Sequence, residues 1–562
     1  MHMLKMMFRC DGGNTPEIGT GHVARCSRLA EAMIGGGDVA VSFLMQDNPF
    51  ARDLAGTVKW KVELFERPEG CRRILEDKKP DILVVDRLDS DLAFMEMARS
   101  LCGVLVSLDD LGPGAEMADI LINGIVGDGK TSYAGPEYVV IPPGVGASRK
   151  EIRPECRKIF VSFGGYDHLN LTLKTARALE RLDPKTGIIL VVGKVYPFRS
   201  ELEAFIKTAK RPFSLHQAPA DFALMLTGAD LAITNGGLTL FEAMAAGIPT
   251  LVLAQYEHQA VTAKRFQKRG GAEFIGMGDM ASSEDILSRT SGLMSDHNLR
   301  SLMSHKAQGL VDGEGLSRVA DLIRVVKPLD WDSGFFGFKI AKATSYRMSE
   351  RMASFIDRWC RERSVRCLYY LCDCDHAGSV EVAERHGYHF TDIRVRFELD
   401  MEGFLPRGTW AEAIKGCVES DLERIKGIAR SSYVQSRYYF DGNFDKARLE
   451  EFYSGWLENT FRSKDGKVFV AHLHGKIVGY ISGEISNKGR LGRIILVGVE
   501  GAHAGSGVGG QLVDAMLDYM HGRGVYSVEV VTQGRNIAAQ RLYQKSGFKI
   551  VSAHIWYHKW FH

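Results

Sequence analysis

The stretch RCDGGNTPEIGTGHVARC, residues 9–26, decides the fold of the first half of the chain. An apolar run at residues 6–8 predicts a strand before it, and residues 23–33 predict a helix after it. The loop between them is made permissive by its glycines, Gly12, Gly13, Gly19 and Gly21. A strand, a glycine-rich loop and a helix N-terminus form an anion site, because backbone N–H groups and the helix dipole converge on the ligand.

The same loop carries a candidate catalytic group, His22. The loop is neither a dinucleotide fingerprint, since its glycines do not follow G-x-G-x-x-G, nor a Walker loop, since no G-K-[ST] follows. A single histidine is often structural. Beside a phosphate cradle, however, a titrating imidazole suits general acid–base catalysis.

Composition limits the class of protein. A chain of 562 residues is too long for one core and predicts about three or four domains. A formal charge of +2 favours neither nucleic acid nor a membrane surface as a partner. Residues 1–8 lack the apolar core of a signal peptide, and no apolar run reaches the roughly 20 residues of a membrane span. The ten scattered cysteines lack zinc spacing, so we expect a cytoplasmic protein with reduced thiols and no metal.

Residues 6–145 alternate strand and helix. Strands are predicted at 39–44, 81–86 and 104–110, and the second of these ends in Asp86. Acids at the carboxyl ends of parallel strands stand where open α/β sheets bind ligands. For Asp109 and Asp110 the alternative is that they only cap the helices that follow.

A second α/β unit follows a proline- and glycine-rich break at 142–154. Strands at 158–163, 188–192 and 231–235 each run into a glycine turn. Residues 238–246 then predict a helix that carries Glu242, and 249–253 predict a last strand. Two successive units of this kind are typical of paired Rossmann-like domains that bind nucleotide-activated sugars.

The motifs in these two units resemble one family. They are R-C-D-G-G-x-x-x-x-I-G-x-G-H-x-x-R-C, L-D-D-L, S-F-G-G-x-D-x-x-N-L-T-L-K and A-D-L-A-I-x-x-G-G-x-T-x-x-E, followed by His258-Gln259. In this order over about residues 4–325 they resemble the UDP-sugar hydrolase of the pseudaminic acid pathway. That enzyme cleaves UDP from a 2,4-diacetamido-2,4,6-trideoxy-altrose and is related to glycosyltransferases of GT-B type.

The resemblance implies roles for residues of this sequence. His22 becomes the general base that activates water, and Glu242 a ligand of the ribose hydroxyls; the alternative for Glu242 is an ordinary helix-surface glutamate. N–H groups at the glycine turns suit the charge that gathers on a leaving diphosphate. The implied UDP-sugar-binding residues are Asp11, Gly19, Gly21, Asp86, Ser162, Gly164, Gly165, Asn170, Asn235, Gly236, Gly237, Thr239, Glu242, His258 and Gln259. His258 replaces a small polar residue such as Asn, a change that bears on sugar selectivity more than on hydrolysis.

A further structural unit is predicted to begin after Lys327-Pro328. Residues 329–400 predict strand, helix (348–362), strand (367–372), helix (379–386) and strand (394–399). The segment 381–390, with its Gly387-Tyr388 turn, prefigures 536–548 with Gly547-Phe548, which hints at a degenerate half-repeat.

The final 160 residues contain a second phosphate seat. A hairpin is predicted across Gly475, then a strand at 492–499, the loop AGSGVGG at 504–510 and a helix at 511–521. With the strand 528–532, N-I-A-A-Q-R-L-Y at 536–543 and S-G-F at 546–548, this series resembles the GNAT N-acetyltransferases. L-D-W-D-S-x-F-F-G at 329–337, Ser436-Arg437-Tyr438 and residues 452–459 narrow the resemblance to enzymes that acylate the 4-amino group of a nucleotide-linked 4-amino-4,6-dideoxy sugar.

The GNAT resemblance implies an acetyl-CoA site. Asn536 orders the coenzyme, and Tyr543 protonates the departing thiolate, as a phenol with a pKa near 10 can; the alternative for Tyr543 is a plain core residue. The implied binding residues are Val497, Gly498, Val499, Gly505, Ser506, Gly507, Val508, Gly509, Gly510, Asn536 and Tyr543. Ala504 stands where the family has Arg or Gln, so one pyrophosphate contact is missing. No acid or histidine stands at a spacing that marks the base for the acceptor amine.

The whole chain therefore predicts an α/β protein with two Rossmann-like domains (1–148 and 149–327) and an α+β acetyltransferase (328–405 as an N-terminal lobe, 406–562 as the acetyl-CoA-binding domain). We expect a bifunctional enzyme of nonulosonic acid biosynthesis that acetylates a UDP-linked 4-amino sugar and then hydrolyses UDP from the product. The alternatives are a glycosyltransferase in place of the hydrolase, an inactive half that serves as a binding module, and a related diamino sugar in place of the pseudaminic one.

Overall fold

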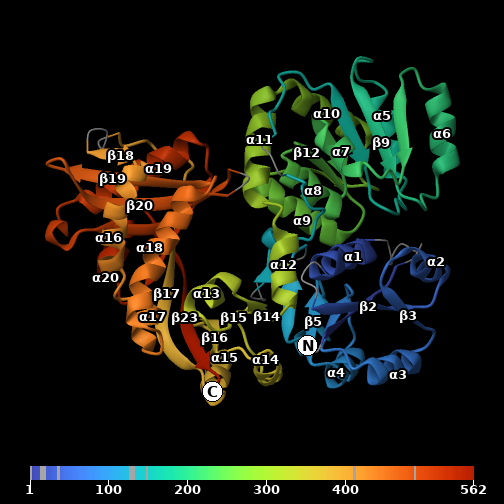
Figure 1. Cartoon of the computed structure of the whole chain (residues 1–562). Coiled ribbons are helices and arrows are strands. Elements are labelled where there is room, and N and C mark those ends of the chain that lie inside the picture. Colours follow the sequence, from blue (N-terminus) through green and yellow to red (C-terminus); the bar gives the residue numbers. More distant parts are fainter. Residues whose placement is uncertain are drawn as a thin grey trace. The chain divides into compact units, whose positions relative to one another are not determined.

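A computed structural model describes residues 3–12, 21–34, 38–125, 133–146, 150–408, 413–486 and 489–562. The chain forms two compact units, Met1–Arg324 and Val325–His562, and each is described by itself (Figure 1). The predicted site residue Gly19 and the predicted boundary between residues 148 and 149 lie outside the described residues.

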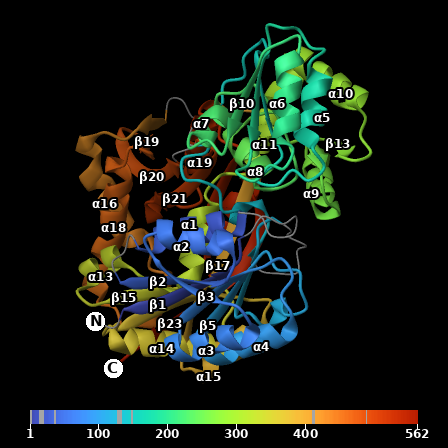
Figure 2. The same ribbon diagram turned by 90° about the vertical axis from the view of Figure 1, so that its right-hand side faces the viewer.

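The first domain of unit 1 is built on a parallel sheet with the strand order β3-β2-β1-β4-β5-β6-β7. Short apolar strands, buried on both faces, form its centre. Figure 2 shows α1 and α2 on one side of the sheet and α3 and α4 on the other. The elements are β1 (Leu4–Cys10), α1 (Gly21–Ile34), β2 (Val39–Gln46), α2 (Pro49–Thr57), β3 (Lys61–Phe65), α3 (Pro68–Lys78), β4 (Ile82–Asp86), α4 (Leu92–Leu101), β5 (Val104–Leu108), η1 (Ala115–Met117), β6 (Ile120–Asn123), β7 (Tyr133–Ala134) and η2 (Pro136–Tyr138).

The second domain repeats this topology with a parallel sheet in the order β10-β9-β8-β11-β12-β13. Apolar side chains pack on both faces of the sheet in two separate clusters. The elements are β8 (Lys158–Ser162), α5 (Leu171–Leu179), β9 (Gly187–Val192), α6 (Arg199–Thr208), β10 (Phe213–Gln217), α7 (Phe222–Thr227), β11 (Leu231–Thr234), α8 (Leu238–Ala246), β12 (Thr250–Ala254), α9 (Glu257–Lys268), β13 (Glu273–Met277), α10 (Ser283–Ser295), α11 (His297–Leu310) and α12 (Gly315–Ile323).

Helix α12 follows the second domain in sequence but packs against α1, η2 and β6 of the first. Arg318 donates to the carbonyl of Glu137 at 3.0 Å, and Arg324 to that of Ala32 at 3.0 Å. Gly315 permits this approach, because a Cβ there would lie 2.1 Å from the carbonyl oxygen of Val139. The sequence range predicted for the second domain therefore ends in a helix that returns to the first.

Unit 2 is organised around one ten-stranded sheet, in the order β14-β15-β16-β23-β17-β22-β21-β20-β19-β18. The two predicted parts, 328–405 and 406–562, share this sheet. The elements are β14 (Val326–Pro328), α13 (Asp330–Phe336), β15 (Ile340–Ala343), α14 (Glu350–Glu362), β16 (Cys367–Asp373), α15 (Ala377–Arg385), β17 (His389–Asp400), β18 (Ile414–Gly416), η3 (Glu419–Asp421), α16 (Leu422–Ser432), α17 (Arg437–Asp441), α18 (Lys446–Arg462), β19 (Gly466–Leu473), β20 (Lys476–Ile485), β21 (Leu491–Val499), η4 (Gly501–His503), α19 (Val508–Gly522), β22 (Ser527–Gln533), α20 (Ile537–Lys545) and β23 (Lys549–Trp560).

The predicted half-repeat is confirmed in this sheet. The run β14-β15-α14-β16-α15-β17 has the same element order as β20-β21-α19-β22-α20-β23, apart from the extra helix α13 and turn η4. In each run the first pair of strands is antiparallel and the second pair parallel. The two halves interlock, because β23 of the second half lies between β16 and β17 of the first. A glycine-rich loop precedes the helix only in the second half, before α19.

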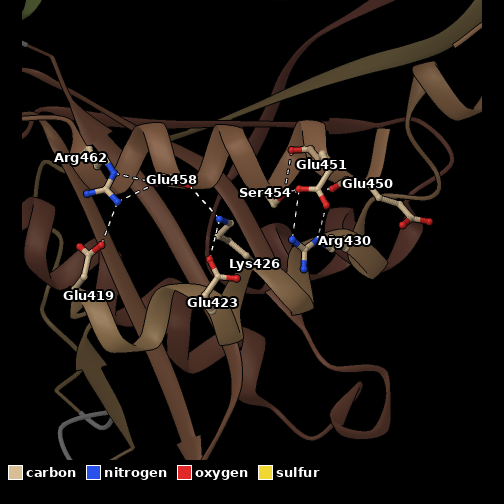
Figure 3. Close-up of polar contacts among 9 residues, drawn as sticks. All are labelled: Glu419, Glu423, Lys426, Arg430, Glu450, Glu451, Ser454, Glu458 and Arg462. Atoms are coloured by element: carbon tan, nitrogen blue, oxygen red, sulfur yellow. Dashed lines mark hydrogen bonds and ion pairs between the residues drawn. The ribbon is translucent and has the colours of Figure 1, made fainter. Parts of the chain in front are cut away.

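Helices α16 and α18 pack side by side and carry a row of ion pairs (Figure 3). Lys426 lies between Glu423 (2.9 Å) and Glu458 (3.2 Å), and Arg430 donates to Glu451 at 3.0 Å. Exposed pairs of this kind contribute little to the free energy of unfolding. The opposite side of the helix pair is apolar and joins the core of the unit.

Candidate active sites

His22 and Asp86 meet where the first sheet changes direction. Strands β1 and β4 are neighbours, and the chain leaves them toward opposite sides, so their carboxyl ends form the crevice in which open α/β sheets bind ligands. His22 lies in the first turn of α1 and Asp86 ends β4. The two side chains are joined by a hydrogen bond of 2.6 Å between Nδ1 of His22 and Oδ1 of Asp86.

Asp86 is held from several sides. It is fully buried and accepts from Nε of Arg25 at 2.8 Å, and Arg25 in turn pairs with Asp109. Desolvation alone would raise the pKa of Asp86, but Arg25 and His22 outweigh it and lower the pKa well below the usual value. An ionised Asp86 accepts a hydrogen bond from Nδ1–H of His22, so the lone pair lies on Nε2, which can act as a base.

Other acids of this edge have structural partners. Asp11, a predicted ligand, forms an ion pair with Arg9 at 2.7 Å and accepts from the amide of Gln46 at 2.9 Å. Asp109 accepts from the amide of Ile125, and Asp110 accepts from the amides of Ser90 and Gly112. Neither Asp109 nor Asp110 caps an α-helix, so that alternative is wrong.

The second sheet gathers its predicted residues at one edge. The loops that follow β8, β11 and β12 leave three adjacent strands. Asn235 and Gln255 both donate to the carbonyl of Phe163, at 2.9 and 3.0 Å, and so tie the three loops together. The N-terminus of α8 opens at Gly237, whose amide donates to Asn235 at 3.1 Å. A helix N-terminus at such an edge is a common place for anion binding.

Backbone conformation and tight packing explain two of the glycines at this edge. Gly164 has a φ of +84°, a conformation that favours glycine. A Cβ on Gly236 would lie 2.4 Å from the carbonyl oxygen of Gln259. Of the other predicted residues, Ser162 and Thr239 are buried, and Gln259 caps the amide of Gln255 at 2.9 Å.

Aromatic side chains contact two predicted ligands at this edge, His258 and Asn170. The ring of His258 stacks on that of Tyr256, with centroids 5.5 Å apart, and Tyr256 stacks on His168 at 4.9 Å. Burial lowers the pKa of His258. Asn170 has a φ of +53° and accepts from the hydroxyl of Tyr196. The amide of Asn170 is therefore already oriented by the protein.

Glu242 is buried, which excludes the surface alternative. It lies on α8 of the second domain, 3.7 Å from Arg28 on α1 of the first. Burial raises the pKa of Glu242 to about 7, and Arg28 opposes this only in part. This carboxyl group therefore changes its charge near neutral pH.

Unit 2 contains a pocket of about 910 Å³ that starts at the predicted pyrophosphate loop. Gly505 and Gly507 have φ values of +80° and +89°, and helix α19 begins at Val508, three residues earlier than predicted. No atom lies within 4 Å of a Cβ built on Gly505, Gly507 or Gly510. The loop is therefore an open cradle at a helix N-terminus, as a pyrophosphate requires.

The pocket continues where two parallel strands part. Strands β21 and β22 pair from Leu491 to Ile494 and then separate, and both line the pocket beyond that point. Beyond Ile494 the backbone of β21 is no longer paired with β22. The carbonyl of Val497 accepts a hydrogen bond from the hydroxyl of Tyr433 at 3.1 Å. Residue 498 is a glycine because a Cβ there would lie only 2.5 Å from the ring of Tyr480.

Asn536 and Tyr543 both line this pocket. Asn536 is the N-cap of α20, accepting from the amide of Ala539 at 3.1 Å. Tyr543 is buried beside Phe397 and Phe548, and burial raises the pKa of its phenol, which therefore stays protonated. Tyr543 is therefore both a buried core residue and part of the pocket wall.

Asp392 is the acid that the sequence did not reveal. A β-bulge interrupts the pairing of β17 with β23 between Phe390 and Asp392, and Asp392 lines the same pocket as Tyr543. Burial raises the pKa of Asp392 to about 6, while Arg535, 3.4 Å away, lowers it only in part. In the sequence, F-T-D-I-R reads as an ordinary strand, and the pairing that makes the bulge comes from β23.

Among the described residues, no helix is long and apolar enough to cross a membrane. A model of the acetyltransferase (GNAT) family matches residues 432–548. The spore coat polysaccharide biosynthesis protein SpsG of Bacillus subtilis is 31% identical over 330 residues, which are 56% of this chain and 96% of SpsG. The dTDP-fucosamine acetyltransferase of Escherichia coli O6:H1 is 24% identical over 240 residues, 42% of this chain and 97% of that enzyme. The crystal structure of Acinetobacter baumannii MurG gives a TM-score of 0.45 at 17% identity, covering 57% of this chain and 99% of MurG.

The fold and the two sites define a protein in which a pair of Rossmann-like domains is followed by a unit whose residues 432–548 match the acetyltransferase (GNAT) family. The match to SpsG, at 31% identity over 96% of that protein, assigns the family of the chain. The chain belongs to the family of the spore coat polysaccharide biosynthesis protein SpsG.

Proposed function

We propose that this chain is a bifunctional enzyme that carries out two consecutive steps on a nucleotide-linked amino sugar. Unit 2 transfers the acetyl group of acetyl-CoA to the 4-amino group of a UDP-4-amino-4,6-dideoxy-N-acetyl-hexosamine. Unit 1 then hydrolyses UDP from the 2,4-diacetamido-2,4,6-trideoxy product. The pathway is that of a nonulosonic acid of the pseudaminic type.

The observation that supports the hydrolytic step is the hydrogen bond between His22 and Asp86. Nε2 of His22 takes a proton from water, whose oxygen attacks C1 of the sugar. The bond between C1 and the diphosphate oxygen breaks, and UDP leaves with the electron pair. The ionised Asp86 stabilises the imidazolium, and N–H groups at Gly164-Gly165 and Gly236-Gly237 receive the diphosphate charge.

The acetyl transfer is carried by the pocket that joins the 505–510 loop to Asp392 and Tyr543. The acceptor amine must lose a proton to attack the thioester carbonyl, and Asp392 is the acid placed to accept it. The carbon–sulfur bond breaks, and the phenol of Tyr543 protonates the thiolate. A base with a pKa of about 6 and an acid that stays protonated at neutral pH suit these two roles.

The substrate class has support from the relatives. The Escherichia coli relative is named for the acetylation of dTDP-fucosamine, a nucleotide-linked amino sugar, and SpsG for polysaccharide biosynthesis. The buried carboxylate of Glu242, which we assign to the ribose hydroxyls, agrees with a nucleotide in unit 1. The remaining predicted UDP-sugar and acetyl-CoA residues keep the roles given above as part of this proposal.

The test is to incubate the purified protein with UDP-4-amino-4,6-dideoxy-N-acetyl-altrosamine and acetyl-CoA and to follow free thiol and UDP together. We expect thiol first and UDP second. In ¹⁸O-labelled water the label should enter the sugar, because C1–O rather than P–O is cleaved. The dTDP-linked acceptor serves as the matched comparison for the nucleotide.

A glycosyltransferase is the competing function for unit 1. UDP released in the absence of any sugar acceptor would argue against it, whereas UDP released only with an acceptor would establish it. Thiol without UDP from either nucleotide sugar would refute the hydrolytic step. Release of neither product would refute the substrate assignment.

A further inference from the structure

Arg437 is a half-buried cation in the wall of the pocket of unit 2. It begins the short helix α17 and lines the pocket together with Tyr438 and Trp556. Its guanidinium carbon lies 4.0 Å from the ring centre of Trp556, 4.4 Å from that of Tyr438 and 4.2 Å from that of Tyr369. Three aromatic faces stabilise the charge and restrict the guanidinium plane.

A chain of hydrogen bonds behind Arg437 fixes its direction. Nη1 donates to Nε2 of His558 at 2.8 Å, so that nitrogen carries no proton, and Nδ1–H of His558 donates to the carboxylate of Asp441. Burial lowers the pKa of His558 to about 4, which keeps the imidazole neutral. Burial opposes the ionisation of Asp441, but hydrogen bonds, first from His558, lower its pKa to about 2.

The same side chains suggest a metal site at first sight, because donor atoms of His389, Asp441 and His558 lie within 4.8 Å of one another. In this structure, however, hydrogen bonds already occupy the donor atoms of Asp441 and His558. Besides His558, Asp441 accepts from Asn443 at 2.6 Å and from Trp560 at 3.1 Å. Both nitrogens of His558 are engaged as well. The cluster therefore holds an arginine in place.

Arg437 retains charge and donors for the pocket. Of its five N–H bonds, one goes to His558 and one to the hydroxyl of Tyr438 at 2.6 Å. Among the described residues no carboxylate forms an ion pair with Arg437; Asp332 acts on it only at longer range. A half-buried guanidinium with no carboxylate partner favours the binding of an anion beside it.

We infer that Arg437 binds the diphosphate of the nucleotide-linked acceptor, and that His558 and Asp441 position it. This rests on the proposed acetylation of a nucleotide sugar. The diphosphate is the anion that distinguishes such an acceptor from a free amino sugar, and a guanidinium fork matches phosphate oxygens. The diphosphate of CoA has its own seat at the 505–510 loop.

The experiment compares two acceptors, the UDP-linked 4-amino sugar and the same sugar without its nucleotide. For Arg437→Gln we expect the KM of the nucleotide-linked acceptor to rise about 10- to 100-fold, the loss typical of a charge-assisted contact. The kinetics with the free sugar should change less than about 3-fold. Inorganic pyrophosphate should compete with the UDP-linked acceptor in the parent protein and not in the variant. Arg430→Gln is the matched control, because Arg430 pairs with Glu451 on the surface of the same unit (Figure 3).

Asp441→Asn tests the positioning role. An amide at this position donates to Nδ1 of His558, which moves the imidazole proton to Nε2, where it faces the donors of Arg437. We expect the KM for the nucleotide-linked acceptor to rise as in Arg437→Gln, with acetyl-CoA affinity and thermal unfolding of the protein close to those of the parent. Arg437→Lys, which keeps the charge without the fork, should lie between parent and Gln.

The outcomes are distinct for the two proposals. If the parent acetylates no 4-amino sugar, the proposed function fails. If the parent acetylates them but Arg437→Gln changes both acceptors equally, or leaves pyrophosphate competition intact, the assignment of Arg437 is overturned while the function stands.

Discussion

Nδ1 of His22 lies 2.6 Å from Oδ1 of Asp86, although 64 residues separate the two in the chain. The contact joins the first turn of α1 to the end of β4, and Arg25 pins the carboxylate from the other side. One nitrogen of His22 is thereby committed to Asp86, and the other is left free at the edge of the sheet.

His22→Ala should stop UDP release and spare thiol release. A positioned general base contributes about 10²- to 10⁴-fold to rate, and we expect a loss of that size in unit 1 alone. Asp86→Asn should reduce UDP release as well, because an amide favours the wrong imidazole tautomer. His216→Ala is the control, since His216 lies on β10 and contacts Ser214. Retention of UDP release by His22→Ala would contradict the assignment.

Glu242 should make the stability of the protein depend on pH. Its pKa is about 7 in the folded chain against 4.5 for the ordinary group, so its stabilising protonated state is complete below 4.5 and lost as the pH rises through 7. Glu242→Gln removes this loss. Measured by denaturant unfolding, the variant should gain on the order of 2–3 kcal/mol relative to the parent between pH 4.5 and pH 8. An equal difference at both pH values would refute the shift.

Asp392→Asn should lower kcat/KM for acetyl transfer about 10²- to 10⁴-fold and leave UDP release from an acetylated substrate unchanged. In the parent, thiol release should fall below a pH of about 6 as Asp392 is protonated. Arg535→Gln removes the cation that lowers this pKa, so the fall should move to higher pH. If the pH profile stays the same in Arg535→Gln, Asp392 is not the titrating base.

Gly236→Ala should destabilise unit 1. The added Cβ would lie 2.4 Å from a backbone oxygen and 2.8 Å from the Cβ of Gln259, so the loop between β11 and α8 must shift. We expect a loss of about 1–3 kcal/mol in the free energy of unfolding, with weaker nucleotide binding. Gly292→Ala, in open space on α10, should gain up to about 1 kcal/mol from helix propensity. Equal stability of the two variants would contradict the packing argument.

Much of the fold follows from local signals in the sequence. Helix α8 was predicted at 238–246 with the bounds that the structure has, because Gly237 and Gly247 mark its ends and Gly247 adopts a φ of +72°. Helix α14 begins two residues later than predicted, since the side chain of Ser349 caps it by accepting from Met352. His22 was predicted as a candidate because it stands beside a glycine loop, and Tyr543 because the GNAT resemblance places it seven residues after Asn536.

The partners of these residues were not predictable in the same way. Asp392 becomes a candidate base only through a bulge that pairing with β23 creates, and no local pattern announces it. Asp86 was predicted to bind the ligand, but the sequence did not show that its side chain bonds to His22 and Arg25. Contacts between residues so distant in sequence depend on the packing of whole sheets.

The position of β23 between β16 and β17 has a consequence for how the protein is made. Unit 1 is complete once residue 324 has left the ribosome, so it can fold while the rest is still being translated. The lobe formed by 326–400 lacks its central strand until residues 549–560 appear. The edges of β16 and β17 that pair with β23 therefore stay unpaired while about 150 further residues are translated. Unit 1 therefore matures during synthesis, and unit 2 assembles in one late step.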